Sequence, residues 1–357
     1  MGRPTSSGPT ERIKPRIMIN SPLGKMGSEI ARAIAKSDEF RLYPLAFIGE
    51  NKKEDCLIIN GQQIMLYTPE ERRFLLEEVQ MIGEPDLVVD YTLPKAAMVN
   101  AQLYCAQRWP FVMGTTGIDA ISLEKMVKET GIRSVVHKNM GEQIVAFQRE
   151  FKEFVDANPN SLMGYLVAII ESHQLGKIDT SGTAKDMVDY LNALGIPYLK
   201  EGMEVRSMDD ITSITTQKKI AMIRNPQLQK KIGVPEEHLK RHGWHTYEFF
   251  PDEGTSPDLI TPLTQKLQKF VEESPVFEDY RLILRSSDTL IERISPDNKV
   301  VFSLFYDKKG RMTFTHNVNG ANIYLDGTFN AARYILGKEA EAGKVSSMID
   351  VINRIKK

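Results

Sequence analysis

The first 140 residues alternate between short apolar runs and amphipathic stretches, and this alternation constrains the fold of the 357-residue chain more than any other feature. The apolar runs have the length of strands, and helical patterns separate them. Strands that alternate with helices predict a parallel, doubly wound sheet of the Rossmann type. The predicted strands are Arg16–Asn20, Arg41–Ile48, Pro85–Tyr91, Pro110–Met113 and Arg133–His137, and the predicted helices are Ser28–Ser37, Lys95–Gln107, Ile121–Thr130 and Gln143–Ala157.

The last third of the chain changes to a β-rich pattern. Apolar runs follow one another closely, and short turns such as Pro296-Asp297-Asn298 separate them. Consecutive strands joined by tight turns predict an antiparallel or mixed sheet. The β-rich runs are Tyr280–Leu284, Thr289–Ile294, Val300–Tyr306 and Met312–Val318, and helical patterns return at Gly327–Leu336 and Ser346–Ile355.

The two patterns together predict an α/β protein with two domains, residues 16–142 with 322–357 and residues 143–321. The first domain would hold the Rossmann-like parallel sheet, and the second an α+β arrangement with the mixed or antiparallel sheet. Residues 1–15 are polar and rich in Pro, Gly, Ser and Thr, which predicts a disordered lead. The second domain is also expected to contain strands Tyr165–Ile170, Ile220–Ile223 and Gly243–Phe249 and helices Ala184–Leu194 and Leu263–Glu272.

Composition limits the partners and the compartment. The formal net charge of -1 gives no basic surface of the kind that nucleic acids or anionic membranes attract, so we expect neither partner. Cys56 and Cys105 are too few for a disulfide framework and lack the spacing of metal ligands. No apolar run approaches the roughly 20 residues that span a bilayer. We therefore expect a cytoplasmic protein, or one in an organelle such as a plastid if the source is eukaryotic.

A strand, a tight turn and a helix open the first domain. The turn, Ser21–Gly27, keeps two glycines of a dinucleotide-binding fingerprint, Gly24 and Gly27. Glu50 follows at close to the roughly 20 residues expected of the acid that meets the ribose hydroxyls. Ser21 stands where the full fingerprint begins with glycine. From this pattern alone, a plain strand-to-helix turn explains the residues about as often as a nucleotide site does.

The segment Glu171–Lys185 concentrates three kinds of chemistry at one passage from strand to helix. His173 supplies an imidazole, the side chain that most often exchanges protons near neutral pH. Lys177 supplies a positive charge or a proton, and the helix opening at Ser181–Thr183 offers backbone N–H groups to an anion. The combination suits a small substrate that carries carboxylates and receives a proton. An ordinary loop with a surface lysine and an N-cap serine explains it about equally well.

Motifs along most of the chain, in order, resemble those of the dihydrodipicolinate reductase (4-hydroxy-tetrahydrodipicolinate reductase) family, particularly its plant-like branch. Gln174 stands where many bacterial members carry a second histidine, as in the plant-like pattern. The most specific string is S-H-Q-x-x-K-x-D-x-S-G-T-A-K. The matching segments are Gly24–Gly27, Asp90–Pro94, Pro110–Gly117, Ser172–Lys185, Gly233–His238, His316–Val318 and the helix from Asp326.

The resemblance implies an NAD(P)H-dependent reduction of 4-hydroxy-tetrahydrodipicolinate to tetrahydrodipicolinate, in the diaminopimelate route to lysine. It implies that His173 donates a proton to the ring and that Lys177 is a second acid. It also implies that residues 143–321 bind the substrate and assemble a homo-oligomer, a dimer or tetramer, through their sheet. No metal is implied. The residues implied to bind the substrate are Gln174, Ser181, Gly182 and Thr183.

The implied hydride donor is a nicotinamide cofactor, NADPH or NADH, bound by residues 16–142 with 322–357. Glu50 favours NADH, whereas Lys52 and Lys53 suit the 2′-phosphate of NADPH, so both cofactors stay open. The implied cofactor-binding residues are Ser21, Pro22, Leu23, Gly24, Lys25, Met26, Glu50, Thr92, Gly114, Thr115, Thr116, His137, Lys138, Asn139 and Met140.

The sequence departs from the family pattern in three places. Ser21–Leu23 replaces the small residues usual in the turn, and the segment 254–309 is longer. Ala321 stands where the family usually has arginine, a contact that Arg311 or Lys308 would have to replace. The altered turn and Ala321 support a second hypothesis, a homologue that keeps the reductase fold but acts as an assembly or interaction factor without turnover.

Two other hypotheses fit the sequence less well. A semialdehyde dehydrogenase needs a thiolate nucleophile, but Cys105 lies in a predicted helix without an adjacent histidine and Cys56 lies in a polar connection. A metal site could be built from His238, His242, His245 or His316, but no carboxylate or thiolate ligand accompanies them in the sequence pattern. Solvated or packed histidines are therefore the better interpretation.

Overall fold

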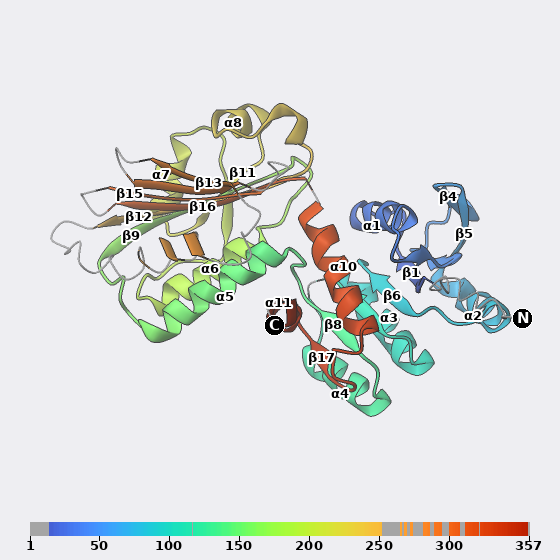
Figure 1. Ribbon diagram of the computed structural model, residues 1–357. Helices are drawn as coiled ribbons and strands as arrows, with labels where there is room; N and C mark the ends of the chain where they lie inside the picture. Colours follow the sequence, from blue (N-terminus) through green and yellow to red (C-terminus); the bar gives the residue numbers. More distant parts are fainter. Residues whose placement is uncertain are drawn as a thin grey trace, which may run out of the picture. The chain divides into compact units, whose positions relative to one another are not determined.

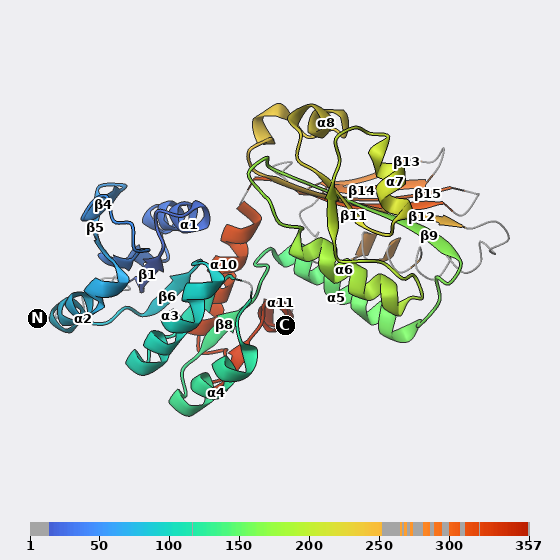
Figure 2. The same ribbon diagram turned by 180° about the vertical axis from the view of Figure 1, so that it is seen from behind.

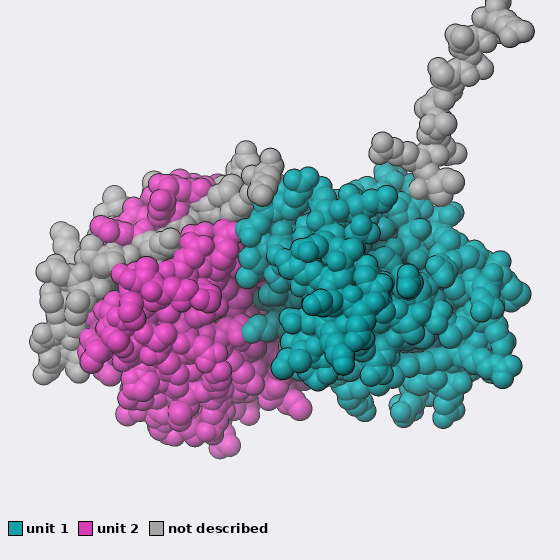
Figure 3. Space-filling model, turned by 90° about the horizontal axis from the view of Figure 1, so that it is seen from below, with its two compact units in different colours: residues 1–139, 327–354 teal, residues 140–326, 355–357 magenta. Residues whose placement is uncertain are grey.

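The chain divides into two compact units, Met1–Asn139 with Gly327–Arg354 and Met140–Asp326 with Ile355–Lys357 (Figure 3). A computed structural model describes residues 14–115, 117–251, 265, 268–269, 272–273, 281–285, 289–294, 300–307, 311–320 and 322–355. Thr116, Lys308, Ala321 and most of the predicted helix Leu263–Glu272 lie outside these residues. The functions expected of the two units stay predictions at this point.

Unit 1 contains a six-stranded sheet in the order β17-β8-β7-β6-β1-β2, and every neighbouring pair is parallel (Figure 1). Its central strands are apolar because they are buried on both faces: Met18, Val88 and Phe111 are each 0% exposed. The strands are β1 (Arg16–Asn20), β2 (Arg41–Leu42), β6 (Leu87–Asp90), β7 (Phe111–Met113), β8 (Ser134–Val136) and β17 (Val345–Ser346). Its helices are α1 (Lys25–Ala35), α2 (Arg72–Ile82), α3 (Pro94–Gln107) and α4 (Ala120–Thr130), with α10 (Asn322–Leu336) from Gly327 onward and α11 (Met348–Ile355) as far as Arg354.

The second predicted strand, Arg41–Ile48, is wrong as a single element. The chain leaves the parallel sheet after β2, and β3 (Leu45–Phe47) joins a separate three-stranded sheet, β3-β5-β4. Pro44 lies between the two strands, and proline has no N–H to continue a ladder. The hairpin of β4 (Cys56–Ile59) and β5 (Gln62–Tyr67) was not predicted, and Cys56 belongs to β4 rather than to a polar connection.

Unit 2 contains an eight-stranded mixed sheet in the order β10-β11-β9-β12-β16-β15-β14-β13. The predicted β-rich runs form four consecutive antiparallel strands, which confirms the expected meander. The strands are β9 (Tyr165–His173), β10 (Gly202–Glu204), β11 (Ile220–Ile223), β12 (His242–Pro251), β13 (Arg281–Arg285), β14 (Thr289–Ile294), β15 (Val300–Tyr306) and β16 (Met312–Asn319). The fold class predicted from the sequence is therefore confirmed in both units.

Two long helices, α5 (Glu142–Ala157) and α6 (Gly182–Ala193), cover one face of this sheet (Figures 1 and 2). Phe147 of α5 stacks on Phe314 of β16, with ring centroids 4.4 Å apart. The short helices α7 (Asp210–Thr216) and α8 (Pro226–Lys231) flank β11 in the chain and were not predicted. Within the described residues, no helix is long and apolar enough to cross a membrane.

Strand β9 is longer than predicted, and this difference bears on the site. The sequence predicted a strand that ends at Ile170, but pairing with β12 continues as far as His173, which lies opposite Gly243. Glu171 and His173 therefore belong to the strand and not to the following loop. Helix α6 likewise begins at Gly182 rather than Ala184, because the Ser181 side chain caps it.

Candidate functional site

The carboxyl end of β9 presents His173 beside a buried acid. The His173 side chain is 15% exposed, and its Nδ1 atom is hydrogen-bonded to a carboxylate oxygen of Glu171, two residues earlier on the same face of the strand. Gly243 leaves space for the imidazole, because a Cβ atom at this glycine would lie 3.3 Å from His173 Nε2. The side-chain amide of Gln229 donates to the His173 carbonyl at 2.7 Å. The ring and its backbone are thus both held in place.

Glu171 is completely buried and pairs with Arg224, which is 3% exposed. Arg224 Nη2 donates to Glu171 Oε1 at 2.6 Å, and Nη1 donates to Oε2 at 3.2 Å. Burial alone would raise the pKa of Glu171, but the hydrogen bonds and charges of His173 and Arg224 outweigh it and lower the pKa. Glu171 is therefore an anion that faces His173.

Lys177 lies in the loop between β9 and α6, and its ammonium group meets Asp179 at 2.8 Å. Burial would raise the pKa of Asp179, but the hydrogen bond and charge of Lys177 lower it. The Lys177 backbone N–H donates to the Gln174 carbonyl at 3.0 Å, so the two predicted site residues share one turn. Gln174 is half-buried.

The residues predicted to bind a substrate carboxylate lie at the start of α6. Ser181 is the N-cap, and its hydroxyl accepts from the Ala184 N–H at 3.5 Å. Gly182 is exposed and Thr183 half-buried. The Ser181 N–H lies 3.5 Å from Glu171 Oε1, which joins the helix start to the acid beside His173. The structure thus brings His173, Lys177 and the start of α6 to one corner, as predicted, although their catalytic and binding roles stay predictions.

Buried histidines lie behind this corner. The rings of His245 and His316 stack with centroids 4.4 Å apart, and His245 lies 5.2 Å from the His173 ring. His245 Nε2 is 2.8 Å from the Ser181 hydroxyl, and His316 Nε2 is 3.1 Å from the Tyr247 hydroxyl. Burial, followed by the neighbouring charges, lowers the pKa of His245 well below its ordinary value and that of His316 to about 3. These histidines are packed and neutral.

Ser172 and His242 form a further buried pair, with Ser172 Oγ 2.8 Å from His242 Nε2. Burial lowers the pKa of His242 to about 4, and the charge of His173 acts in the same direction. The sequence interpretation recognised packed histidines but not their partners. The alternation of β12 and β16 residues across the sheet was the signal that could have paired His245 with His316.

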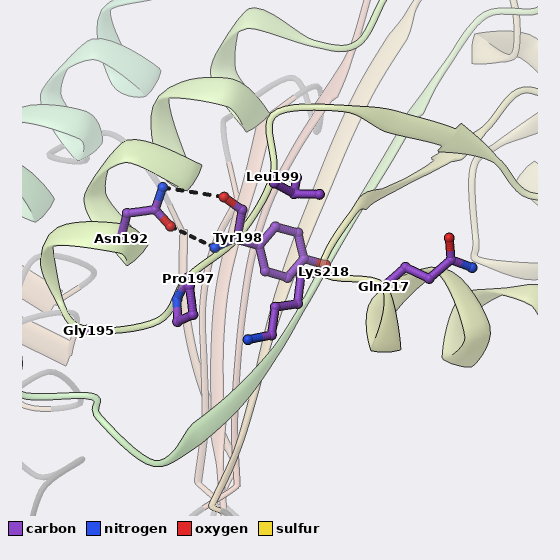
Figure 4. A pocket seen from close by; sticks show the side chains of 7 residues that line it. All are labelled: Asn192, Gly195, Pro197, Tyr198, Leu199, Gln217 and Lys218. Carbon is purple, nitrogen blue, oxygen red and sulfur yellow. Dashed lines mark hydrogen bonds between the residues drawn. The ribbon is translucent and has the colours of Figure 1, made fainter.

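A separate pocket of about 450 Å³ lies at the other end of α6 (Figure 4). Asn192 and Tyr198 line it, and the Asn192 amide is bonded to the backbone of Tyr198, accepting from its N–H at 2.7 Å. A helix of twelve residues is roughly 18 Å long, so this pocket is remote from Ser181. Its polar groups hold the loop after α6 in place.

In unit 1, the predicted nucleotide turn is shaped by close backbone contacts. Ser21 adopts a left-handed conformation with φ of 57°, and its N–H donates to the Phe47 carbonyl at 2.8 Å. The Gly24 N–H donates to the Ser21 carbonyl at 2.9 Å. A Cβ atom on Gly27 would lie 2.1 Å from the same carbonyl oxygen, so only glycine fits there. Gly24 caps α1 without a side-chain hydrogen bond, which leaves backbone N–H groups for an anion.

The remaining predicted cofactor residues of unit 1 follow strands of the same sheet. The Thr115 hydroxyl donates to the Thr92 carbonyl at 3.0 Å and so joins the loops after β6 and β7. Gly114 has to be glycine because the Tyr91 ring occupies the space of a Cβ atom, at 2.4 Å. The loop after β8 is shaped by the His137 ring, whose Nδ1 accepts from the Asn139 N–H at 3.1 Å. The carboxyl ends of parallel strands are where such sheets bind ligands.

Other predicted cofactor residues differ in exposure. Pro22 is buried, Leu23 is 55% exposed, Lys25 and Lys138 are exposed, and Met26 is half-buried. Met140 is 1% exposed and belongs to unit 2.

The candidates for ribose and phosphate recognition also differ. Glu50 is exposed. Lys52 is engaged by the carboxylates of Glu71 at 2.9 Å and Asp55 at 3.1 Å, whereas no ion pair of Lys53 is found within the described part of the chain. Lys53 is therefore the better of the two candidates for a 2′-phosphate.

A buried polar network beneath these loops was missed by sequence reasoning. Asp90, at the end of β6, is 0% exposed and accepts from the Tyr104 hydroxyl at 2.6 Å and from Asn100 at 3.0 Å. Asn20 of β1, which lies opposite Asp90, is hydrogen-bonded to the same Tyr104 hydroxyl. Burial and Asp90 raise the pKa of Tyr104 well above its ordinary value, so it stays a neutral donor. A polar residue that ends each of two apolar strands was the available signal.

Burial also raises the pKa of Cys105, which argues against a thiolate nucleophile.

Comparisons with known proteins identify the family to which this sequence is similar. The family described as "Dihydrodipicolinate reductase, N-terminus" matches residues 15–140. The chain is 30% identical over 349 residues to the "Probable 4-hydroxy-tetrahydrodipicolinate reductase 2, chloroplastic" of Oryza sativa subsp. japonica, covering 96% of this chain and 85% of that one. It is 31% identical to the "4-hydroxy-tetrahydrodipicolinate reductase 2, chloroplastic" of Arabidopsis thaliana, over 94% of this chain and 76% of that one.

The similarity to a bacterial relative is more local. The "4-hydroxy-tetrahydrodipicolinate reductase" of Syntrophomonas wolfei is 32% identical over 187 residues, which is 50% of this chain and 65% of that one. The plant proteins, by contrast, match both units. With this identity sustained over nearly its whole length, the chain belongs to the 4-hydroxy-tetrahydrodipicolinate reductase family.

Proposed function

We propose that this protein catalyses the NAD(P)H-dependent reduction of 4-hydroxy-tetrahydrodipicolinate to tetrahydrodipicolinate in diaminopimelate and lysine biosynthesis. The observation that carries the proposal is the corner in unit 2, where His173, Lys177 and the Ser181 cap of α6 come from one continuous segment. Reduction of a ring substrate that carries two carboxylates needs both an anion-binding site and a proton donor. Membership of the reductase family supports the same reaction.

His173 is assigned the role of proton donor, and Lys177 that of second acid. A well-placed general acid contributes roughly 10²–10⁴-fold to a rate. Lys177 is paired with Asp179 at 2.8 Å, so a dianionic substrate would compete with Asp179 for the ammonium group. The Ser181 hydroxyl and the N–H groups of Gly182 and Thr183 would hold a carboxylate at the positive end of α6.

Unit 1 is assigned the cofactor. The turn from Ser21 to Met26 would hold the pyrophosphate, Glu50 the adenosine ribose, and Gly114–Thr116 with residues 137–140 the nicotinamide side. The turn fits this role because Gly27 lets the backbone pack against the Ser21 carbonyl and the start of α1 carries no side-chain cap. When bound, the nicotinamide supplies the hydride. Lys53 would favour NADPH and Glu50 NADH.

The test couples the purified protein to a synthase that makes the cyclic substrate and follows the oxidation of NADPH and of NADH. We expect turnover with at least one cofactor and its loss in His173→Ala. A folded wild-type protein that neither oxidises nor binds either cofactor would contradict the proposal and favour the role of an assembly or interaction factor.

We also propose that the sheet of unit 2 assembles a dimer or tetramer, and that the protein works in the cytoplasm or a plastid. Thr313 and Thr315 of β16 and Val301 of β15 point to the face opposite Phe314 and are half-buried. The plant relatives are named chloroplastic. Sedimentation of the wild-type protein and of Thr315→Arg tests the assembly, because a monomeric wild type would exclude it.

A further inference from the structure

Glu171 and Arg224 are a buried ion pair that the proposed reaction does not use directly. Both are nearly inaccessible, with exposures of 0% and 3%. Replacing a buried ion pair by apolar residues is often neutral or stabilising, so stability alone is a weak reason for such a pair. Its contacts point to another role.

The two oxygen atoms of Glu171 have separate neighbours. Oε2 is bonded to His173 Nδ1 and lies 3.2 Å from Arg224 Nη1. Oε1 lies 2.6 Å from Arg224 Nη2 and 3.5 Å from the Ser181 N–H. A carboxylate only accepts hydrogen bonds. His173 therefore places a proton on Nδ1, and its Nε2 faces away from the acid.

Arg224 also holds the loop that carries Lys177. Its Nε donates to the Lys177 carbonyl at 2.7 Å, and its Nη2 donates to the Asp179 carbonyl at 3.2 Å. One rigid guanidinium thus contacts the acid behind His173 and the backbone beneath Lys177. A lysine at this position could not make these contacts together, because the planar fork of arginine has donors in fixed directions.

We propose that Glu171 and Arg224, the Glu171–Arg224 clamp, are positioning residues that fix the tautomer of His173 and the place of Lys177. The inference rests on the proposed function for the roles of the two acids. Glu171 holds the proton on Nδ1, so that Nε2 is the nitrogen presented to the substrate. Arg224 keeps the carboxylate ionised and directs both of its oxygens.

Glu171→Gln tests the clamp through the tautomer of His173. With Arg224 present, the glutamine would turn its oxygen toward the guanidinium and its NH₂ group toward His173 Nδ1. The neutral imidazole would then carry its proton on Nε2. In Glu171→Gln with Arg224→Met, the amide loses the guanidinium that orients it, so the preference for the Nε2 proton should weaken. ¹⁵N spectra of the full chain labelled at histidine, assigned by the signals lost in His173→Ala, distinguish the two tautomers.

Kinetics give a second measurement. Glu171→Gln should lower kcat by about 10²–10³-fold and change KM by less than about threefold. The reason is that it alters the proton donor His173 rather than the residues proposed to bind the substrate carboxylate. Arg224→Lys should lower kcat by about 10–100-fold and also raise KM, since it releases the Lys177 loop. Glu201→Gln and Arg206→Lys, at exposed positions of the same unit, are matched controls expected to change neither tautomer nor kcat.

The clamp would be overturned by a wild-type His173 protonated on Nε2 in its neutral form. It would also be overturned by Glu171→Gln keeping the Nδ1 proton with kcat within about threefold of wild type. A merely structural ion pair would lower the amount of folded protein without changing the tautomer. If the wild type shows no turnover, the proposed function fails, yet the tautomer measurement still decides the clamp.

Discussion

The turn Ser21–Gly27 in unit 1 and the corner Glu171–Thr183 in unit 2 are both strand-to-helix passages, but they are built from different materials. The turn consists of backbone contacts: the Ser21 carbonyl accepts from Gly24, and Gly27 packs against it. The corner consists of side-chain charges, with Glu171 and Arg224 buried behind His173. The turn is therefore specified by backbone conformation, and the corner by charged and hydrogen-bonding side chains.

This difference teaches which departures from a family pattern each passage tolerates. Ser21 replaces a glycine and still reaches the left-handed conformation, at a cost of roughly 1–2 kcal/mol. In the corner, by contrast, removal of Glu171 takes the anionic partner from the buried Arg224, a loss of about 3–5 kcal/mol.

The largest expected effect belongs to His173→Ala. We expect kcat to fall by about 10²–10⁴-fold because the proton donor is removed. Cofactor affinity, measured by titration of the full chain with NADPH and NADH, should stay within about twofold, since the turn lies in unit 1. The same loss of kcat in His238→Ala, a half-exposed histidine, would show that the effect is not specific to the corner.

The next largest expected effect is a decrease in the free energy of unfolding of unit 2 at acidic pH. Burial lowers the pKa of His316 to about 3, whereas an unfolded histidine has a pKa of about 6.5. Below pH 6.5 the unfolded chain binds the extra proton, so the free energy of unfolding falls as pH falls toward 3, by up to about 1.4 kcal/mol per pH unit. Between pH 6.5 and pH 5 this amounts to at most about 2 kcal/mol for His316.

His316→Phe measures that contribution. The stability difference of unit 2 between pH 7 and pH 5 should shrink by up to about 2 kcal/mol, even though the Tyr247 hydroxyl loses its partner. Trp109 lies in unit 1 and Trp244 in unit 2, so urea unfolding in a Trp109→Phe background reports unit 2 alone. Phe302→Leu, beside the same ring, should lower stability equally at both pH values. An unchanged pH dependence in His316→Phe would contradict the assignment.

Gly27→Ala tests the turn in the same way that His173→Ala tests the corner. Its Cβ would lie 2.1 Å from the Ser21 carbonyl oxygen, so α1 or the turn has to move. We expect unit 1 to lose about 1–3 kcal/mol, read from Trp109 fluorescence in a Trp244→Phe background, and cofactor affinity to fall by about 10–100-fold. Binding of pyridine-2,6-dicarboxylate, a planar analogue of the substrate, should not change. Gly49→Ala, where a Cβ meets nothing within 4 Å, is the control.

The sequence predicted the parallel sheet and the meander because each has a strong local pattern. It failed where partners are distant in the chain, and it also missed one local hairpin. Arg41–Ile48 was one apolar run, and only Pro44 marked the point where the strand changes sheets. The following hairpin had an available signal: Asn60 and Gly61 take φ of 49° and 79°, the conformation that an Asn-Gly pair favours between two strands.

The candidate site shows the same limit. His173, Lys177 and Ser181 are close in sequence, so one motif predicted that they lie together. Arg224 lies 53 residues from Glu171, and no local pattern connects them. Their pairing follows from β11 lying beside β9, which is a property of the sheet order. Long-range polar partners of this kind are set by topology, and sequence periodicity does not encode them.

The smallest expected effect belongs to Ser21→Gly. This substitution tests whether the turn in unit 1 depends only on backbone contacts, unlike the corner in unit 2. Glycine adopts the left-handed conformation at no steric cost, but it loses more freedom on folding than serine does. We therefore expect unit 1 to gain only about 0.5–1 kcal/mol, with cofactor affinity changed by less than about threefold. Trp109 fluorescence during urea unfolding, in a Trp244→Phe background, measures the stability, and titration with NADPH and NADH measures the affinity. A variant that loses stability, or binds cofactor more than about tenfold more weakly, would mean that the Ser21 hydroxyl itself acts at the turn. In that case the turn, like the corner, depends on a particular side chain.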